Sequence, residues 1–236
     1  MSHEAHIHQA QTKILRELLF LPETTFAELQ RVSGLESDHA KFHIKRLVEL
    51  EYVEKFGSRY RLSIKGKEYA NKLDTDAGVI ERQPKVAVML VVEQVLNGQK
   101  HYLVQQRTKH PLYGFWGCPT GKIRWGESIY TTASRELTEE TGLKALFEFA
   151  GEYHERVVHG TTGEIVEDKI FHVMFTDKFE GEMVKEFEGG RNVWRTLEAM
   201  KQEPKRYKSF DLETQIGIDH GPKLTEMTFT YDNAEF

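Results

Sequence analysis

The sequence predicts an α+β protein made of two domains joined by a linker. Residues 1–75 place apolar side chains at helical spacing and then form two short strand patterns, whereas residues 85–212 combine several strand patterns with a long charged helix. Residues 76–84 (DAGVIERQP) carry Gly and Pro without a clear period, which predicts the linker. Residues 213–236 show little beyond one possible strand, so we expect a C-terminal tail.

The composition is that of a globular protein. Of the 236 residues, 39% are hydrophobic and 29% are charged, both ordinary values. No run approaches the roughly 18 apolar residues that a membrane-spanning helix needs, and no signal peptide pattern stands at the start. We therefore expect no membrane partner. Cys118 is the only cysteine, which excludes an intrachain disulfide and favours a reducing, cytoplasmic location; no nucleophile signature surrounds it.

The N-terminal part predicts an ordered series of helices and strands. The first helix ends at Pro22, Thr25 caps a second, and Ser37 or Asp38 caps a third, in which Phe42, Leu47 and Leu50 are expected to face inward. Two strands at 52–56 and 59–63 turn at Gly57-Ser58, and a last helix covers 65–73. This order resembles a winged helix-turn-helix domain.

That resemblance implies DNA as a possible partner. The third helix would present Lys41, His43, Lys45 and Arg46 to the major groove, and the wing would add Lys55, Arg59 and Arg61. Residues 37–67 carry a local excess of basic side chains, yet residues 1–80 have no net charge. The alternative is a protein-contact module that forms a homodimer, and the sequence leaves both open.

The C-terminal part predicts strands on both sides of the charged helix. Strands are expected at 86–96 and 101–107, joined at Asn97-Gly98, and again at 145–154, 168–176 and 191–195, with a possible strand at 224–231. Helices are expected at 127–141 and 196–203, and the stretch 108–125 is irregular. Tyr130, Ala133 and Leu137 share an arc of the first of these helices and are expected to anchor it to the sheet.

The charged helix concentrates carboxylates on one face. Glu136, Glu139 and Glu140 stand at positions i, i+3 and i+4, where like charges repel and weaken an isolated helix. A bound divalent cation removes this objection, because Mg²⁺ and Mn²⁺ take hard oxygen ligands. Arg135 precedes Glu139 by four residues and can hold it by an ion pair. This pattern therefore predicts a magnesium or manganese site.

The segment as a whole matches a known signature. It reads Gly121, five residues, Glu127, seven residues, Arg135-Glu136-Leu137, one residue, Glu139-Glu140, one residue, Gly142-Leu143. This is similar to the signature of the Nudix hydrolase (MutT-like) family, and a chance match is on the order of 10⁻¹⁰ per start position. The resemblance covers roughly residues 85–205 and implies an α/β/α sandwich. Many members have Gly where Thr120 stands, a position whose carbonyl often binds metal in relatives.

The resemblance also implies an activity. Members cleave the diphosphate linkage of nucleoside diphosphate derivatives with one to three Mg²⁺ ions. By this likeness Glu139 and Glu140 are metal ligands, Glu136 is a ligand or the general base, Glu127 supports a second metal, Thr120 offers its carbonyl and Arg135 orients the carboxylates. A later loop supplies the base in some relatives, which makes Glu186 and Glu188 further candidates.

The substrate-binding residues are left open by the sequence. Phe115, Trp116 and Trp125 could stack on a base or simply pack in the core; Arg107, Lys122 and Arg124 could meet phosphates or only solvent. We expect a hydrolase of a small nucleotide. The alternatives are a transcription regulator that senses a nucleotide and binds DNA, and a hydrolase that uses its N-terminal domain to dimerise or to hold nucleic acid.

Overall fold

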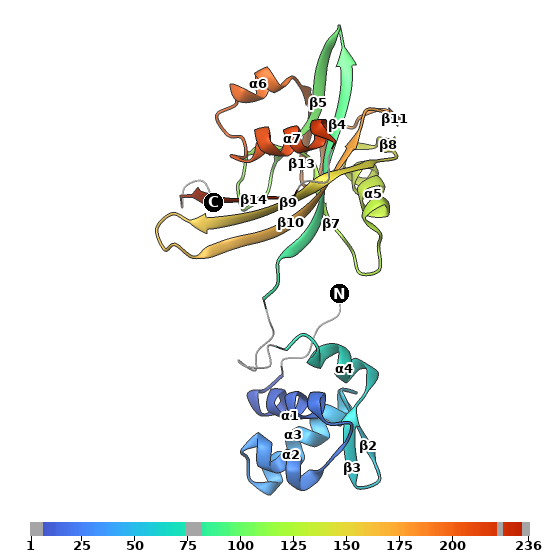
Figure 1. The fold of residues 1–236 in the computed structure, drawn as a ribbon, viewed down its shortest axis with the longest axis vertical. Coiled ribbons are helices and arrows are strands. Elements are labelled where there is room, and N and C mark those ends of the chain that lie inside the picture. Colours follow the sequence, from blue (N-terminus) through green and yellow to red (C-terminus); the bar gives the residue numbers. More distant parts are fainter. Residues whose placement is uncertain (1–6, 74–81, 221–223, 233–236) are drawn as a thin grey trace. The chain divides into compact units, whose positions relative to one another are not determined.

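The computed structural model divides the chain into two compact units, Met1–Arg82 and Gln83–Phe236 (Figure 1). It describes residues 7–73, 82–220 and 224–232, so most of the predicted linker at 76–84 lies outside the described residues. Within the described part, no helix is both long and apolar enough to cross a membrane. The α+β class predicted from the sequence is confirmed.

The N-terminal unit holds helices around a small sheet. Its elements are α1 (Gln9–Phe20), β1 (Thr24–Thr25), α2 (Phe26–Ser33), α3 (Ser37–Glu49), β2 (Val53–Phe56), β3 (Arg59–Leu62) and α4 (Ile64–Ala70). The sheet order is β1-β3-β2, with antiparallel pairs. This is the order that the sequence predicts, with β1 added.

Local signals explain the helix ends in this unit. The Thr25 side chain accepts from the backbone N–H of Glu28, whose own side chain accepts from the backbone N–H of Thr25, and Gly34 ends α2 with φ 70°. The prediction for Phe42 is wrong, because its side chain is 66% exposed. The buried face of α3 instead carries Ala40, Ile44 and Leu47, at the spacing of one helix face.

The C-terminal unit is built on one mixed sheet. Its strand order is β12-β13-β5-β4-β10-β9-β14, with β6 beside β5 and β7 beside β4. The bounds are β4 (Lys85–Leu96), β5 (Gln99–Arg107), β6 (Trp116–Gly117), β7 (Thr120–Lys122), α5 (Ile129–Thr141), β8 (Lys144–Ala145), β9 (Glu148–His159), β10 (Ile165–Thr176), β11 (Phe179–Glu180), β12 (Glu186–Phe187), β13 (Gly190–Arg195), α6 (Leu197–Lys201), α7 (Phe210–Asp219) and β14 (Leu224–Tyr231). Strands β10 and β4 run parallel, as do β14 and β9.

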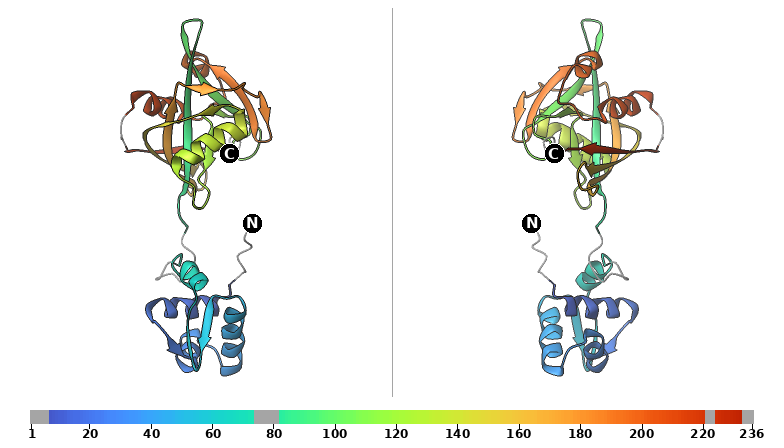
Figure 2. Two further views of the ribbon diagram at one scale, coloured as in Figure 1. Left: turned by 90° about the vertical axis from the view of Figure 1, so that its right-hand side faces the viewer. Right: turned by 90° about the vertical axis from the view of Figure 1, so that its left-hand side faces the viewer.

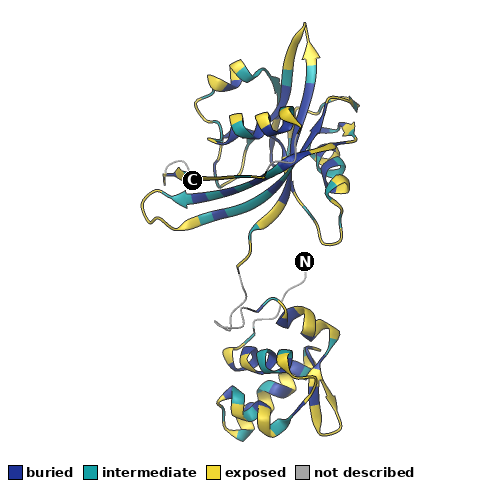
Figure 3. Cartoon of the chain, viewed as in Figure 1, coloured by how far each residue is buried: buried dark blue, intermediate teal, exposed yellow. Residues whose placement is uncertain are grey.

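Helices cover both faces of this sheet, which gives an α/β/α sandwich (Figure 2). Strand β4 explains the layering, because it is buried on both sides (Figure 3). Val88, Leu90 and Val92 pack with Ala133 and Leu137 of α5. The alternate residues Ala87, Met89 and Val91 pack with Phe210 and Ile216 of α7. A strand buried on both faces reads as a continuous apolar run.

Two expectations for this unit are wrong. Residues 213–236 are not a tail: α7 extends to Asp219 and packs on the sheet, and β14 pairs with β9 from Leu224 to Tyr231. Tyr130 does not anchor α5, because its side chain is exposed, whereas Ala133 and Leu137 are fully buried. Tyr130 shares a helix face with Ala133 and Leu137 but lies in the first turn of α5, where its side chain is 55% exposed.

Candidate active site

The signature segment folds as a strand, a loop and helix α5. The Ser128 side chain accepts from the backbone N–H of Thr131 and begins the helix, and Gly142 ends it with φ 76°. Strand β7 pairs with β4 and brings Gly121 against the helix. A Cβ added to Gly121 would lie 2.0 Å from Cγ of Glu136. A residue with a Cβ at this position would require the Glu136 side chain to move away from β7.

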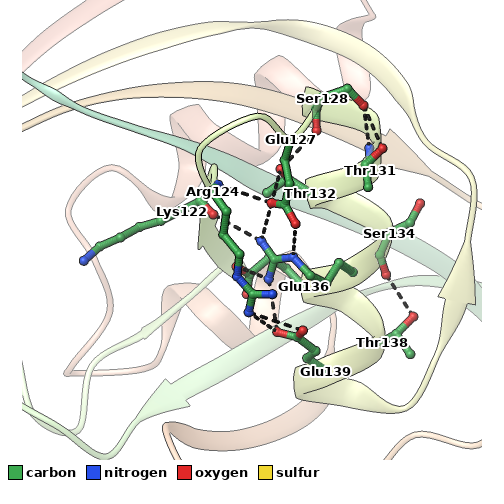
Figure 4. Close-up of polar contacts among 11 residues, drawn as sticks. Lys122, Arg124, Glu127, Ser128, Thr131, Thr132, Ser134, Glu136, Thr138 and Glu139 are labelled. Carbon is green, nitrogen blue, oxygen red and sulfur yellow. Dashed lines mark hydrogen bonds and ion pairs between the residues drawn. The ribbon is translucent and has the colours of Figure 1, made fainter. Parts of the chain in front are cut away.

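Arg135 holds three carboxylates of the signature together (Figure 4). Its Nε and Nη2 donate to the two oxygens of Glu127 at 2.7 and 2.8 Å. Its Nη1 donates to Glu136 at 2.7 Å and to Glu139 at 3.0 Å, and Nη2 also reaches the carbonyl of Lys122 at 3.2 Å. Hydrogen bonds from Arg135 lower the pKa of Glu127 to about 2. The guanidinium thus keeps Glu127 ionised and aligns all three carboxylates.

Glu139 and Glu140 stand in different environments. Arg124 Nη2 donates to both oxygens of Glu139, at 3.1 and 3.3 Å, and the carboxylate is half exposed. Glu140 is turned inward, where Gln105 Nε2 donates to it at 3.0 Å, and burial raises its pKa. The Asn192 amide donates to the backbone carbonyl of Glu140 at 2.8 Å and ties the end of α5 to β13.

The donor chemistry of this cluster fits a hard divalent cation. Carboxylates from one helix and its entry loop face the backbone of β7, where Gly121 leaves no room for a side chain. In the described part of the chain, however, no three His, Cys, Asp or Glu side chains already form a metal-binding group. Arg135 and Arg124 form ion pairs with Glu127, Glu136 and Glu139.

A cavity of about 570 Å³ lies beside this cluster. Glu136, Glu140 and the three residues of β7 line it, and Arg107 and Lys109 add positive charge. Its lining also includes Met89, Leu112, Val157 and Phe171, which are apolar, and Lys85, Glu155, Glu167, Lys169, Tyr207 and Glu213, which are polar. The cavity therefore combines carboxylates, cations and apolar surface in one place.

The predicted substrate residues divide into two groups. Arg107 and Lys122 line the cavity, although Arg107 also donates to the carbonyls of Lys109, His110 and Pro111 and so holds the loop after β5. Phe115, Trp116 and Trp125 do not line it.

The three aromatic candidates lie in other surroundings. Phe115 is buried against Tyr207 and Tyr231. Trp116 is buried with the guanidinium of Arg195 4.9 Å from its ring centre. Trp125 is 93% exposed. These positions disfavour stacking of any of the three rings on a substrate base. For Phe115 and Trp116 the physical reason is that core packing leaves no ring face open.

The two candidate bases outside the helix are exposed. Glu186 lies in β12 and Glu188 in the turn that follows, and the residues between and after them, Phe187 and Gly189, line the cavity. Both glutamates stay predictions. Cys118 is buried, and burial raises the pKa of its thiol, which disfavours a nucleophile at this position.

The cavity residues that the sequence analysis missed include Glu155, Glu167, Lys169 and Glu213. They come from β9, β10 and α7, which are far apart in the sequence. No motif joins them, because only the pairing of β9 with β10 and the packing of α7 bring them together.

The candidate DNA-binding side chains of the N-terminal unit have acidic partners. Ion pairs join Lys41 to Asp38, Lys45 and Arg46 to Glu49, Arg59 to Glu23 and Arg61 to Glu54, at 2.9 to 3.8 Å. The ring of His43 stacks on that of His8 at 4.7 Å, and burial lowers its pKa. His43 is therefore turned toward α1, although DNA contact by the other side chains stays a prediction.

The C-terminal unit is similar in sequence to known proteins. The model of the NUDIX domain matches residues 83–213. An uncharacterized Nudix hydrolase of Bacillus subtilis, YvcI, is 29% identical over 133 residues, which are 51% of this chain and 75% of that protein. An 8-oxo-dGTP diphosphatase of Buchnera aphidicola is 33% identical over 57 residues, 24% of this chain and 44% of that protein.

A solved structure shares the fold. The NUDIX domain of Shewanella oneidensis NrtR, crystallised with ADP ribose, superposes with a TM-score of 0.52 at 19% identity, over 64% of this chain and 96% of that one. The match of the domain model covers more than half of the chain and contains the whole signature from Gly121 to Leu143. The chain therefore belongs to the Nudix family of hydrolases, which act on acid anhydrides in phosphorus-containing compounds.

Proposed function

We propose that this protein is a magnesium-dependent pyrophosphohydrolase that cleaves the diphosphate linkage of a nucleoside di- or triphosphate derivative. The observation that supports this most directly is the shared lining of the cavity: Glu136 and Glu140 of the signature helix stand in the same 570 Å³ space as Arg107, Lys109 and Lys122. Cations of this kind bind phosphate oxygens. The name of the Buchnera relative, a diphosphatase of a nucleoside triphosphate, supports the same substrate class.

The carboxylates of the signature would hold the metal. Glu136, Glu139 and Glu140 are the proposed ligands, with Glu127 and the Thr120 carbonyl in support, and Mn²⁺ could replace Mg²⁺. When bound, such ions neutralise the charge of a diphosphate and lower the pKa of water. Arg135 orients the carboxylates through the contacts described above.

The remaining steps use the chain's own groups. Lys122 and Arg107 hold the phosphates in the cavity, and the general base is Glu136, Glu186 or Glu188. Positioning and electrostatic stabilisation account for most of the rate in phosphoryl transfer, so the arrangement of these side chains decides the activity.

Phosphate release from a nucleotide panel with Mg²⁺ tests this function. Wild type and Glu139→Gln are compared, with Glu198→Gln as a matched control because Glu198 is an exposed glutamate on α6. Glu139→Gln should lose at least about 100-fold in turnover, the size expected for a major catalytic group. Unchanged turnover of Glu139→Gln, or no release from any nucleotide, would contradict the proposal.

The alternative, a nucleotide-sensing regulator that binds DNA through the N-terminal unit, has one supporting feature. Phe42 on α3 and Phe56 in β2 are exposed beside basic side chains. The ion pairs of those basic side chains within the same unit reduce the positive field that DNA binding needs. Binding to a promoter fragment that weakens steeply with salt would favour the regulator, and no shift at low salt would count against it.

Assembly and location are also proposals. We infer that the protein is a homodimer and lies in the cytoplasm. Sedimentation of the purified full chain tests whether it is a dimer.

A further inference from the structure

The cavity contains three glutamates that the proposed hydrolysis does not use. Glu155 lies on β9, Glu167 on β10 and Glu213 on α7, and all three are buried. Glu213 is only 4% exposed. Buried carboxylates are costly unless a partner compensates them, so their partners indicate what each one does.

Only one of the three glutamates is neutralised within the described residues. Lys169 Nζ lies 2.6 Å from one oxygen of Glu167, and Lys85 Nζ lies 3.4 Å from the other. Glu155 and Glu213 have no ion pair with a described residue. Instead they accept hydrogen bonds from hydroxyl groups, Glu155 from Tyr153 at 3.0 Å and Glu213 from Ser209.

Each of these hydroxyls satisfies one carboxyl oxygen. Tyr153 donates to Oε2 of Glu155, and Ser209 donates to Oε1 of Glu213. The second oxygen of each side chain accepts no hydrogen bond from a described residue, and both side chains line the cavity. Each glutamate therefore keeps one carboxyl oxygen that can bind a ligand in the cavity.

The protonation state of Glu213 decides which hydrogen bonds it can form. Burial and the nearby charge of Glu155 raise its pKa. At neutral pH Glu213 is mainly a neutral acid, which can donate one hydrogen bond and accept others. Glu155 lines the same cavity beside it.

The sheet register places this pair away from the phosphate-binding residues. Lys122 of β7 pairs with Ala87 of β4. Two residues earlier in β4, on the same face of the sheet, Lys85 pairs with Lys169 of β10. Lys169 in turn pairs with Glu155 of β9. Three strand steps separate β7 from β9. At about 4.8 Å per step this is roughly 14 Å, a span that a nucleoside diphosphate can fill.

The walls between the two ends suit a flat ring. Met89 and Phe171 project from the sheet, and Leu112 and Val157 are buried beside them. Apolar walls with a few convergent polar groups are typical of small-molecule sites.

We propose that Glu155 and Glu213 form the base-recognition end of the cavity and select a nucleobase that carries an exocyclic amino group. This inference rests on the proposed function, because that function places the diphosphate at Glu136, Glu140 and Lys122. One hydrogen of the amino group is donated to the open oxygen of Glu155, and the acid proton on the open oxygen of Glu213 is donated to a ring nitrogen beside the amino group.

The physical basis of the selection is the mismatch with an oxo base. A carbonyl oxygen in place of the amine would face the carboxylate of Glu155 without a proton between them. A site that hydrogen-bonds a donor rejects the analogue without it, because its buried acceptors stay unpaired.

Calorimetric binding of nucleoside diphosphates to the full chain with Mg²⁺ tests the inference. The pairs ADP and IDP, GDP and IDP, and CDP and UDP each differ at an amino group. We expect at least one amino-bearing member to bind tenfold or more tightly than the member of its pair that lacks this amino group. The preference should fall to threefold or less in Glu155→Gln and in Glu213→Leu, whereas Glu198→Gln should keep it. Thermal unfolding identifies a variant that fails to fold, and Glu155→Gln preserves the side-chain shape.

The outcomes separate this inference from the proposed function. Equal binding within all three pairs, a preference that survives both substitutions, or no nucleotide binding would overturn the inference. Phosphate release measured in parallel reports on the function: hydrolysis without base preference defeats only the inference, and base preference without hydrolysis defeats only the function.

Discussion

Arg135 and Glu127 form a two-point contact in which Nε and Nη2 of the arginine reach the two carboxylate oxygens at 2.7 and 2.8 Å. The remaining guanidinium nitrogen is thereby directed at Glu136 and Glu139. A planar fork can satisfy several acceptors at fixed angles, which a lysine ammonium cannot. The contact links the loop before α5 to the helix itself.

Arg135→Lys should therefore lower kcat by about 100-fold, in line with the cost of misplaced catalytic groups. The charge is kept, but the alignment of the carboxylates is lost. Steady-state kinetics with the substrate found in the nucleotide panel measure the effect. Arg61→Lys, an ion-paired arginine of the N-terminal unit, is the control and should keep wild-type kcat. Equal kcat in both variants would show that Arg135 has no positioning role.

Gly121→Ala tests the close approach of β7 to α5. The added Cβ would lie 2.0 Å from Cγ and 2.1 Å from Cδ of Glu136, so the carboxylate or the strand must move. We expect a loss of about 100-fold in kcat and a destabilisation of about 1–3 kcal/mol. Gly163→Ala is the comparison, because its Cβ meets no atom within 4 Å and only its positive φ costs energy. Should Gly121→Ala keep full activity, the backbone of β7 is not part of the site.

The stability of the protein should depend on pH through Glu213. Burial and the charge of Glu155 raise the pKa of this carboxyl from 4.5 to about 8, so between these values the folded protein holds a proton that the unfolded chain has lost. The stabilisation is complete below pH 4.5 and decreases as the pH rises to about 8, by at most about 1.4 kcal/mol per pH unit.

Urea unfolding of wild type and Glu213→Gln across this range measures the effect. The neutral amide does not titrate, so the stability difference between the two proteins should shift in favour of the variant as the pH rises. A difference that is constant from pH 5 to pH 8 would show that Glu213 titrates equally in both states.

The sequence predicts the signature helix and the strands around it well, for clear physical reasons. The signature segment carries seven fixed charged or glycine positions, four of them in the helix, and β4 is a long apolar run typical of a buried strand. The ends of α2 follow from Thr25 and Gly34, whose capping geometry is local.

The C-terminal elements could not be predicted in the same way. The bounds of β14 agree with the possible strand at 224–231, but its side chains are mostly exposed and show no alternation, so its parallel pairing with the distant β9 could not be predicted. Helix α7 has an apolar side that is clear only once Phe210 and Ile216 meet the sheet. The prediction that Phe42 faces inward was wrong for a different reason, because an apolar residue on a helix does not have to be buried.

The residues that line the cavity come from separate parts of the chain. Part of the lining comes from the family signature, and Glu213 comes from α7, which lies more than sixty residues later in the sequence. A substitution in α7 changes the shape and charge that a ligand meets and leaves every signature residue untouched. Two chains with identical signatures can therefore process different compounds, and comparisons limited to the signature would not distinguish them.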